Sequence, residues 1–174
     1  MKKITKIIYN FLLLLIAINF NFSVVAKEAK NLGVFGSWEA FSELNGKNLF
    51  CYIGAYPQRS HGNYKKRGES YMLITHRPAE KSFGEVSIKA GYQYLKASEV
   101  AVVIEKNAFS LFTDAGYAFT HNKKTDIALI EAMKRGEQMI VKGISSRKTK
   151  TTDTYSLKGF SAAWKTINKA CKYK

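Results

Sequence analysis

Side chains that could carry chemistry are few in this sequence and stand apart from one another. The three histidines, His61, His76 and His121, are not spaced as ligand pairs, whereas a protein metal site needs three or four converging ligands. We therefore expect no metal and no cofactor. These histidines are interpreted as ordinary polar or surface residues.

Recognisable catalytic motifs do not occur either. The chain has no Gly-x-Ser-x-Gly elbow, no His-Glu-x-x-His and no phosphate-binding Gly-x-x-x-x-Gly-Lys. Its 13 acidic residues are scattered and show no pair suited to general acid–base catalysis. We predict that the protein is not an enzyme. The alternative is a periplasmic hydrolase or glycan-modifying enzyme with an unrecognised active site, because catalytic triads are assembled from residues distant in sequence.

Basic residues near aromatic ones give a more specific signal, because such surfaces attract anions and can stack on sugars. Two loops supply the predicted anionic-ligand site, which consists of Arg59, Tyr64, Lys65, Lys66, Arg67, Arg147, Lys148 and Lys150. The last 21 residues add five lysines and no acid. The sequence leaves open whether these groups converge on one surface or form three separately solvated patches.

The first 26 residues predict an export signal. Three lysines precede an apolar run at residues 11–18, and Val24 and Ala26 suit a cleavage site. An uncleaved anchor is the alternative, but the run is far shorter than the ~18 residues that span a bilayer. Cleavage near Ala26 would leave residues 27–174 as one domain, in the periplasm, in the outer envelope or secreted.

The net charge points to an anionic partner. The full chain has 28 Lys and Arg, of which three lie in the expected signal, against 13 Asp and Glu. Such a field attracts anionic glycans, lipid headgroups or other acidic groups on a host surface. The alternative is that the charge only keeps the protein soluble. Nucleic acid is the least expected partner, because the chain is predicted to be exported.

The two cysteines predict a disulfide between the two ends of the domain. Cys51 lies in the apolar segment 48–56, which we interpret as a buried strand, and Cys171 continues a helix face with Trp164 and Ile167. Export favours the bridge, with two buried free thiols as the alternative. Closing a loop of ~100 residues is worth about 4.7 kcal/mol in the chain-entropy model.

Alternating apolar residues dominate the rest of the chain and predict strands bounded by turns. One of these segments, 86–94, would place Tyr92 and Tyr94 on a core face. Residues 27–31 are expected to be a charged lead-in. The predicted strands are 38–43, 48–56, 70–75, 86–94, 99–105, 108–113, 138–144 and 151–157, with 117–120 as an extension.

Two helices complete the predicted fold. Thr125 is expected to cap a helix over 126–135, and Ser161 is a candidate cap for a helix over 161–172. Strands at short spacing with only two helices favour a mainly β protein. We predict an antiparallel β-sandwich of about eight strands with two short helices, one of them C-terminal.

Several ordered phrases resemble the invasion-associated locus B family. They are WEAF, GNYKKRGESYMLITHRPAEK, FSLFTD, VKGISSRKTKTTDTYSLKGF and AAWKTINKAC. The resemblance covers roughly residues 38–171 and implies an exported, β-rich envelope or secreted protein of a Gram-negative bacterium. It also implies, through the family name, a contribution to host-cell interaction or invasion. The family supplies no catalytic residues to place on this chain.

Overall fold

The computed structural model describes residues 29–173, so the expected signal segment lies outside the described residues. Eleven antiparallel strands form one sheet in the order β1-β2-β3-β5-β6-β9-β8-β7-β10-β11-β4. The strands are β1 (Lys30–Phe35), β2 (Trp38–Asn45), β3 (Asn48–Ala55), β4 (Arg59–Gly62), β5 (Tyr71–Arg77), β6 (Ser82–Lys89), β7 (Glu99–Ile104), β8 (Asn107–Asp114), β9 (Tyr117–Thr120), β10 (Gln138–Ile144) and β11 (Lys150–Ser156). The remaining elements are η1 (Pro78–Glu80), α2 (Lys123–Arg135) and α3 (Phe160–Ala170).

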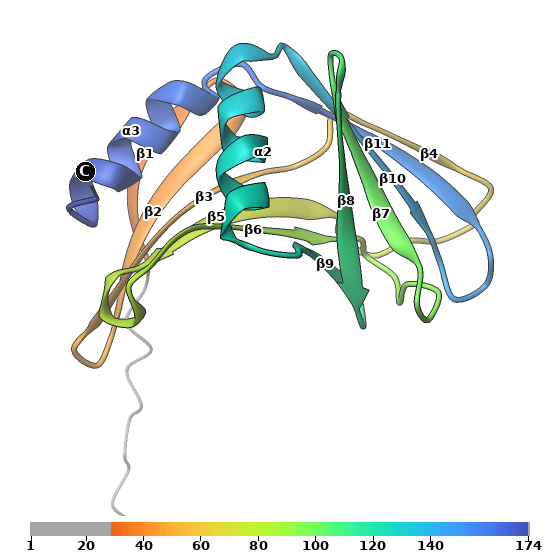
Figure 1. The fold of residues 1–174 in the computed structure, drawn as a ribbon, viewed down its shortest axis with the longest axis horizontal. Helices are drawn as coiled ribbons and strands as arrows, with labels where there is room; N and C mark the ends of the chain where they lie inside the picture. Colours follow the sequence, from red (N-terminus) through yellow and green to blue (C-terminus); the bar gives the residue numbers. More distant parts are fainter. Residues whose placement is uncertain (1–28, 174) are drawn as a thin grey trace, which may run out of the picture.

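The sheet bends strongly, and its two halves enclose one apolar core (Figure 1). Only three residues separate β3, near one end of the strand order, from β4 at the other end. The two ends of the strand order are therefore in contact. Trp38 on β2 donates its indole N–H to the carbonyl of Ser156 on β11 at 3.0 Å. Both halves therefore bury their apolar faces against each other and against the helices.

The mainly β, antiparallel fold with one C-terminal helix is confirmed, with eleven strands instead of about eight. Three strands account for the difference: β1, β4 and β9, the last of which forms over the segment expected only as an extension. β1 includes part of the expected charged lead-in, and all four residues of β4 are exposed. β4 has no apolar face that would mark it in the sequence, because backbone pairing alone holds it at a sheet edge, whereas β1 packs Leu32 and Phe35 against the core.

The segment expected to be one strand over 86–94 is divided. β6 ends at Lys89, and Gly91 turns the chain with φ +74°. A Cβ on Gly91 would lie 2.2 Å from the carbonyl oxygen of Gly68, so the close approach requires glycine. Tyr94 is buried as expected, but Tyr92 is only partly buried. This turn positions the cavity described below.

Helix α2 is capped three residues earlier than expected. Asn122 is the cap and accepts the backbone N–H of Thr125 at 3.0 Å. Asparagine is favoured at the N-cap because its side-chain oxygen accepts a hydrogen bond from an otherwise unpaired backbone amide. Lys134 and Arg135 occupy the last turn, where their positive charges interact favourably with the helix dipole.

Helix α3 is preceded by Gly159 instead of a Ser161 cap. Gly159 has φ +91°, and a Cβ there would lie 1.9 Å from the carbonyl oxygen of Phe35. The helix buries Phe160 and Ile167 against the sheet. None of the helices in residues 29–173 has the length and apolar character needed to cross a membrane.

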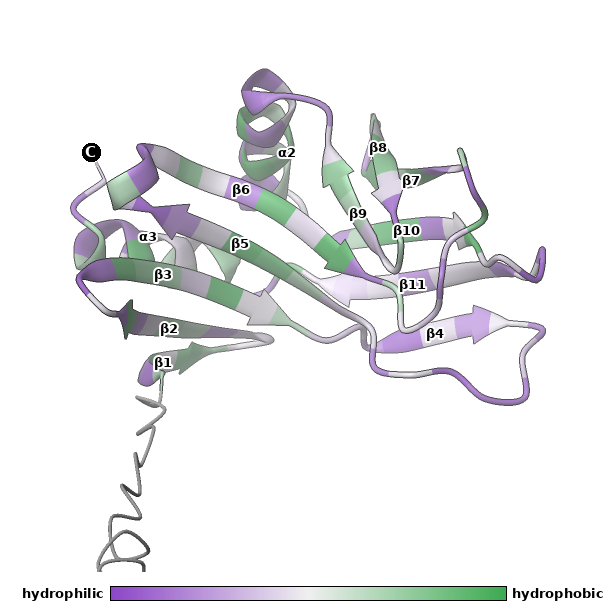
Figure 2. Cartoon of the chain, turned by 90° about the horizontal axis from the view of Figure 1, so that it is seen from below, coloured by the Kyte–Doolittle hydropathy of each residue, from purple (hydrophilic) through white to green (hydrophobic). Residues whose placement is uncertain are grey.

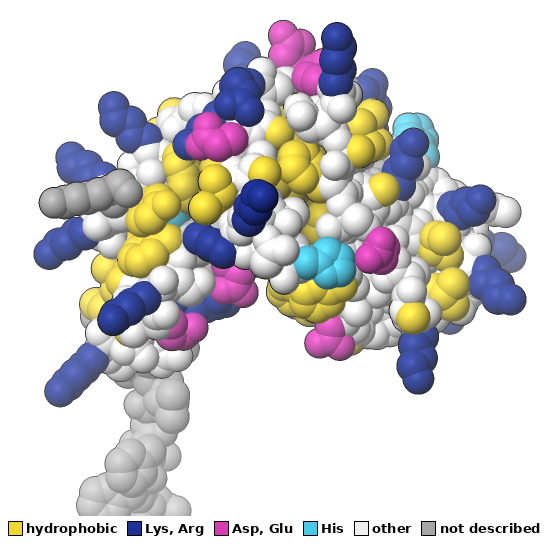
Figure 3. All heavy atoms as spheres, viewed as in Figure 1, with side chains coloured by type: hydrophobic (Ala, Val, Ile, Leu, Met, Phe, Trp, Pro, Cys, Tyr) yellow, Lys and Arg dark blue, Asp and Glu magenta, His cyan; other side chains and the backbone are white. Residues whose placement is uncertain are grey.

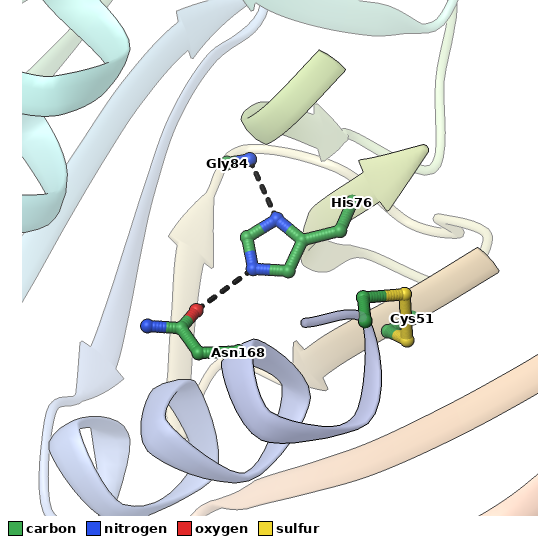
Figure 4. Close-up of a disulfide and its surroundings, with 5 residues drawn as sticks. Cys51, His76, Gly84 and Asn168 are labelled. Atoms are coloured by element: carbon green, nitrogen blue, oxygen red, sulfur yellow. Dashed lines mark hydrogen bonds between the residues drawn. A yellow bond between two sulfur atoms is a disulfide. The ribbon is translucent and has the colours of Figure 1, made fainter. Parts of the chain in front are cut away.

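The predicted Cys51–Cys171 disulfide is confirmed (Figure 4). It joins the middle of β3 to the end of α3 and closes a sequence separation of 120 residues. Both cysteines are buried. The bridge therefore fixes the C-terminal helix on the half of the sheet that contains β1, β2 and β3.

Candidate functional site

A cavity of about 670 Å³ lies between two basic loops, residues 63–68 and 145–149. We call it the basic cavity. Its volume is within the range of small-molecule sites. The described residues that line it are Asn63, Tyr64, Lys65, Lys66, Arg67, Gly68, Gly91, Tyr92, Gln93, Ser145, Ser146, Arg147, Thr149 and Thr151.

The segment after β6 holds the two loops together. The N–H of Gly68 donates to the carbonyl of Gly91 at 2.9 Å, and the N–H of Ser146 donates to the carbonyl of Gln93 at 2.7 Å. One short segment thus bonds to both loops, which are about 80 residues apart in sequence. The basic cavity is defined by backbone contacts and not only by mobile side chains.

Arg67 anchors the first loop from beneath. Its guanidinium donates two parallel bonds of 2.6 Å to the carboxylate of Asp153 on β11 and a third, from Nε, to the carbonyl of Ala90. Both side chains of the pair are almost fully buried. Burial would lower the pKa of Arg67, but the bonds and charge of Asp153 outweigh it and raise this pKa. The charge of Arg67 is therefore compensated within the protein.

Two tyrosines border this guanidinium. Its central carbon lies 5.0 Å from the ring centroid of Tyr92 and 5.8 Å from that of Tyr64. The hydroxyls of Tyr92 and Thr151 are 2.6 Å apart and share a hydrogen bond. Burial raises the pKa of Tyr92, so the phenol stays neutral at physiological pH. The rings give the basic cavity partly apolar walls beside its polar groups.

The structure brings together five of the eight residues predicted for the anionic-ligand site. Those that line the basic cavity are Tyr64, Lys65, Lys66, Arg67 and Arg147. Arg59 is on β4, Lys148 is exposed in the second loop and Lys150 is exposed at the start of β11; these three are not in the lining. Lys65, Lys66 and Arg147 are exposed and supply the uncompensated charge.

Sequence reasoning missed several residues of this site. The sequence predicts a core face for Tyr92 and no role for the polar groups of Gln93, Ser145 and Thr151, although all four line the basic cavity. The buried partner Asp153 was also missed. An acidic residue inside the otherwise uncharged strand segment TTDTYS was the available signal, because a carboxylate in a buried strand needs a cationic partner.

The electrostatic character of the basic cavity follows from its lining. Among the described lining residues there is no carboxylate and no histidine. Three cations without a lining acid favour an anion in the space between them. Elsewhere on the molecule, Figure 3 shows Lys and Arg side chains projecting around the rim of one face.

The histidines do not form a metal site. His76 is fully buried; its Nδ1 accepts the N–H of Gly84 at 2.8 Å, and its Nε2 lies 2.8 Å from Oδ1 of Asn168 (Figure 4). His121 lies 3.3 Å from the exposed carboxylate of Glu99. Within residues 29–173, no three His, Cys, Asp or Glu side chains are grouped as metal ligands.

Comparison with known proteins places the chain in a family. The sequence model described as "Invasion associated locus B (IalB) protein" matches residues 38–168. The chain belongs to the IalB family. The family match spans β2 to most of α3 and includes both basic loops, so it covers every described part of the basic cavity.

A solved structure has the same fold. The crystal structure of invasion associated protein B from Bartonella henselae is similar with a TM-score of 0.56 and 13% sequence identity. The match covers 82% of this chain and 97% of the other. A search of curated proteins finds no match. The IalB fold is thus shared at an identity too low to compare individual site residues.

Proposed function

We propose that this IalB family protein is an exported, non-enzymatic binding protein that takes an anionic ligand in the basic cavity. The observation that carries the proposal is the convergence of two distant basic loops on one cavity whose described lining contains no acid. An anionic glycan, a lipid headgroup or an acidic group on a host surface has the required charge. The family name adds the context of host-cell invasion.

Export is part of the same proposal. The buried Cys51–Cys171 disulfide supports an oxidising compartment, where such bridges form and persist. We infer cleavage near Ala26 and a mature chain of residues 27–174 that acts as one domain. The net positive charge, retained after cleavage, would concentrate the protein at anionic surfaces.

A binding role is favoured over an enzymatic one by the groups that the cavity offers. General acid–base catalysis most often uses a placed histidine or carboxylate, and the described lining has neither. Its three uncompensated cations, aromatic walls and small hydroxyl side chains can hold and orient an anion. They are suited to recognition more than to proton transfer.

A serine, a glutamate and a histidine lie close together outside the cavity. Ser110 donates to a carboxylate oxygen of Glu99 at 2.5 Å, and His121 lies 3.3 Å from the other oxygen. In a catalytic triad, histidine lies between serine and acid and takes the serine proton. Here the acid lies between the other two, and all three residues are exposed. This arrangement does not activate the serine.

The test removes the three uncompensated charges and leaves the anchor intact. The variant replaces Lys65, Lys66 and Arg147 by Ser. Arg67 is retained because it is paired with Asp153. Calorimetric titration with a sulfated disaccharide and flotation with phosphatidylglycerol vesicles should show at least about a tenfold loss of affinity for the bound probe. Binding by the parent should weaken from low to physiological salt, because exposed charges are screened beyond ~8 Å.

A matched control separates the cavity from net charge alone. The control variant replaces three exposed lysines near or on α3 by Ser: Lys158, Lys165 and Lys169. It loses the same charge as the cavity variant. Equal weakening in both variants would contradict a site at the basic cavity, and no binding of either probe by the parent would contradict the anion-binding proposal.

A further inference from the structure

A second hollow lies on the outer face of the sheet, where β2, β3 and β5 run side by side (Figure 2). Gly54 is at its centre. The register places Glu39 of β2 and Leu73 of β5 directly on either side of Gly54. Glycine adds no side chain at this point of the face, which only the Cδ2 of Leu73 approaches closely, and the space lined by these residues measures about 350 Å³. We call it the Gly54 hollow.

The hollow lies on the face opposite the core. Along β3, Cys51 and Ile53 are fully buried, whereas the alternating Tyr52 and Gly54 are only partly buried. Side chains alternate between the two faces of a strand. Helix α3 packs with the buried set through the disulfide. The hollow therefore faces away from α3.

Aromatic rings close both ends of the hollow along the strands. At one end, Phe41 and Tyr52 are directly opposite in register and stack with centroids 5.3 Å apart. At the other end, Tyr56 and Tyr71 meet edge to face at 6.2 Å. All four rings line the same space. The arrangement is an open box with aromatic ends, one carboxylate side and one leucine side.

The charge of this box is opposite to that of the protein as a whole. Glu39 is its one ionisable group besides the phenols, and none of its described lining residues is Lys, Arg or His. The whole chain has 28 Lys and Arg. Burial, helped by Tyr117, raises the pKa of Tyr71 to about 12, and burial raises that of Tyr52, so both phenols are neutral. The hollow thus presents a single negative charge.

These groups suit a cation, and a quaternary ammonium more than a primary one. Aromatic faces attract cations, and Lys89 Nζ already lies 5.2 Å from the ring centroid of Tyr71. A primary ammonium brings three strongly hydrated N–H donors, whose removal from water between aromatic rings is costly. A quaternary ammonium has no donor to leave unpaired. Its charge pairs with the carboxylate of Glu39, and its methyl groups pack against the aromatic rings.

Aromatic side chains continue across the same face beyond β5. Ser87 of β6 is opposite Leu73 and also opposite Phe119 of β9, which is opposite Phe112 of β8. Phe112 is 40% exposed and Tyr117 on β9 is 37% exposed. Exposed aromatic residues are favoured at the level of lipid headgroups. This continuity favours a membrane-borne ammonium over a free one.

We propose that the Gly54 hollow binds the choline group of phosphatidylcholine and places this face of the sheet on a choline-lipid membrane. The ammonium lies between the aromatic ends beside Glu39. The lipid phosphate lies toward Lys89, which is opposite Tyr71 on the next strand. This site is separate from the basic cavity and does not depend on the function proposed for it.

The direct test uses soluble phosphocholine and matched vesicles with the purified protein. Calorimetric titration should show binding of phosphocholine at least about tenfold tighter than phosphoethanolamine, because the primary amine is more costly to desolvate. Vesicles of phosphatidylcholine should carry the protein on flotation. Equal affinity for the two headgroups, binding of phosphocholine without binding to the vesicles, or binding of neither would overturn the proposal.

Two variants locate the site. Glu39→Gln removes the charge of an exposed residue and should weaken phosphocholine binding about threefold to tenfold. Gly54→Val adds a branched side chain, which strands favour, between Glu39 and the aromatic ends; its Cβ would lie 2.9 Å from the movable Cδ2 of Leu73. This variant should abolish binding while the unfolding midpoint stays near that of the parent.

The control is Glu43→Gln, on the same face of β2 but outside the lining. It should bind as the parent does. Undiminished binding by Gly54→Val, or equal losses in Glu39→Gln and Glu43→Gln, would overturn the assignment. Binding of sulfated disaccharide by all three variants should equal that of the parent, so a failed choline site is distinguishable from a failed basic cavity.

Discussion

Arg67 and Asp153 face each other across 86 residues of sequence through two parallel contacts of 2.6 Å. The pair joins the first basic loop to β11 and is almost completely shielded from water. Ser70 adds a bond of 3.3 Å to the same carboxylate. Removing one member of a buried pair leaves the other charge uncompensated, which is far more costly than losing an exposed pair.

Replacing Asp153 by Asn should therefore destabilise the protein by about 3–5 kcal/mol, measured by urea unfolding. Arg67→Lys should also destabilise it, because an ammonium cannot make the two-pronged contact. Both variants should loosen the first basic loop and weaken anion binding. The control is Arg135→Lys, whose side chain is 71% exposed and 3.6 Å from Glu131; its change should stay within about 0.5 kcal/mol. A similarly small change for Asp153→Asn would contradict the anchoring role.

The sequence predicted the features that depend on local periodicity. The alternation around Cys51 indicated a buried strand, and the spacing of Trp164, Ile167 and Cys171 indicated one helix face. These patterns arise because the buried face of an element must be apolar along its whole length. The mainly β class and the disulfide pairing followed from them, and both are confirmed.

Features that depend on contacts between distant segments could not be predicted from the sequence. The apolar alternation of segment 86–94 continues past Gly91, but the strand itself ends at Lys89. The chain turns at Gly91, where the backbone of Gly68 comes too close for a side chain. β4 carries no apolar pattern because its backbone alone pairs with β11. The two basic loops converge only because segment 91–93 bonds to both. No local pattern encodes such a meeting.

The disulfide should contribute strongly to stability. Replacing Cys51 and Cys171 by Ala should lower the free energy of unfolding by about 2–5 kcal/mol, as is usual for small exported domains. The separation of 120 residues makes the loss of loop constraint large. Urea unfolding followed by tryptophan fluorescence measures it, since Trp38 and Trp164 are both buried. The reduced parent should behave like the double variant; an unchanged midpoint in both would refute the prediction.

Protonation of His76 should destabilise the fold in mild acid. The amide of Gly84 donates to Nδ1, so the neutral ring carries its proton on Nε2, which lies 2.8 Å from the side-chain amide of Asn168. A second proton, on Nδ1, would place two N–H donors opposite each other, because the Gly84 amide already points at this nitrogen. Burial among Phe83, Trp164 and Tyr173, with a smaller effect of Lys123, lowers the pKa of His76 despite the bond to Asn168.

A lowered folded-state pKa means that the unfolded chain binds the proton more readily. The contribution of the neutral ring is therefore complete above about pH 6.5, the ordinary histidine pKa, and declines as the pH falls below it toward the folded-state pKa. Urea midpoints at about pH 7.5 and 5.5 should fall more for the parent than for His76→Gln, which cannot titrate there. His61→Gln, at an exposed position, should keep the parental pH dependence. If His76→Gln loses as much stability between the two pH values as the parent, the buried imidazole is not the titrating group.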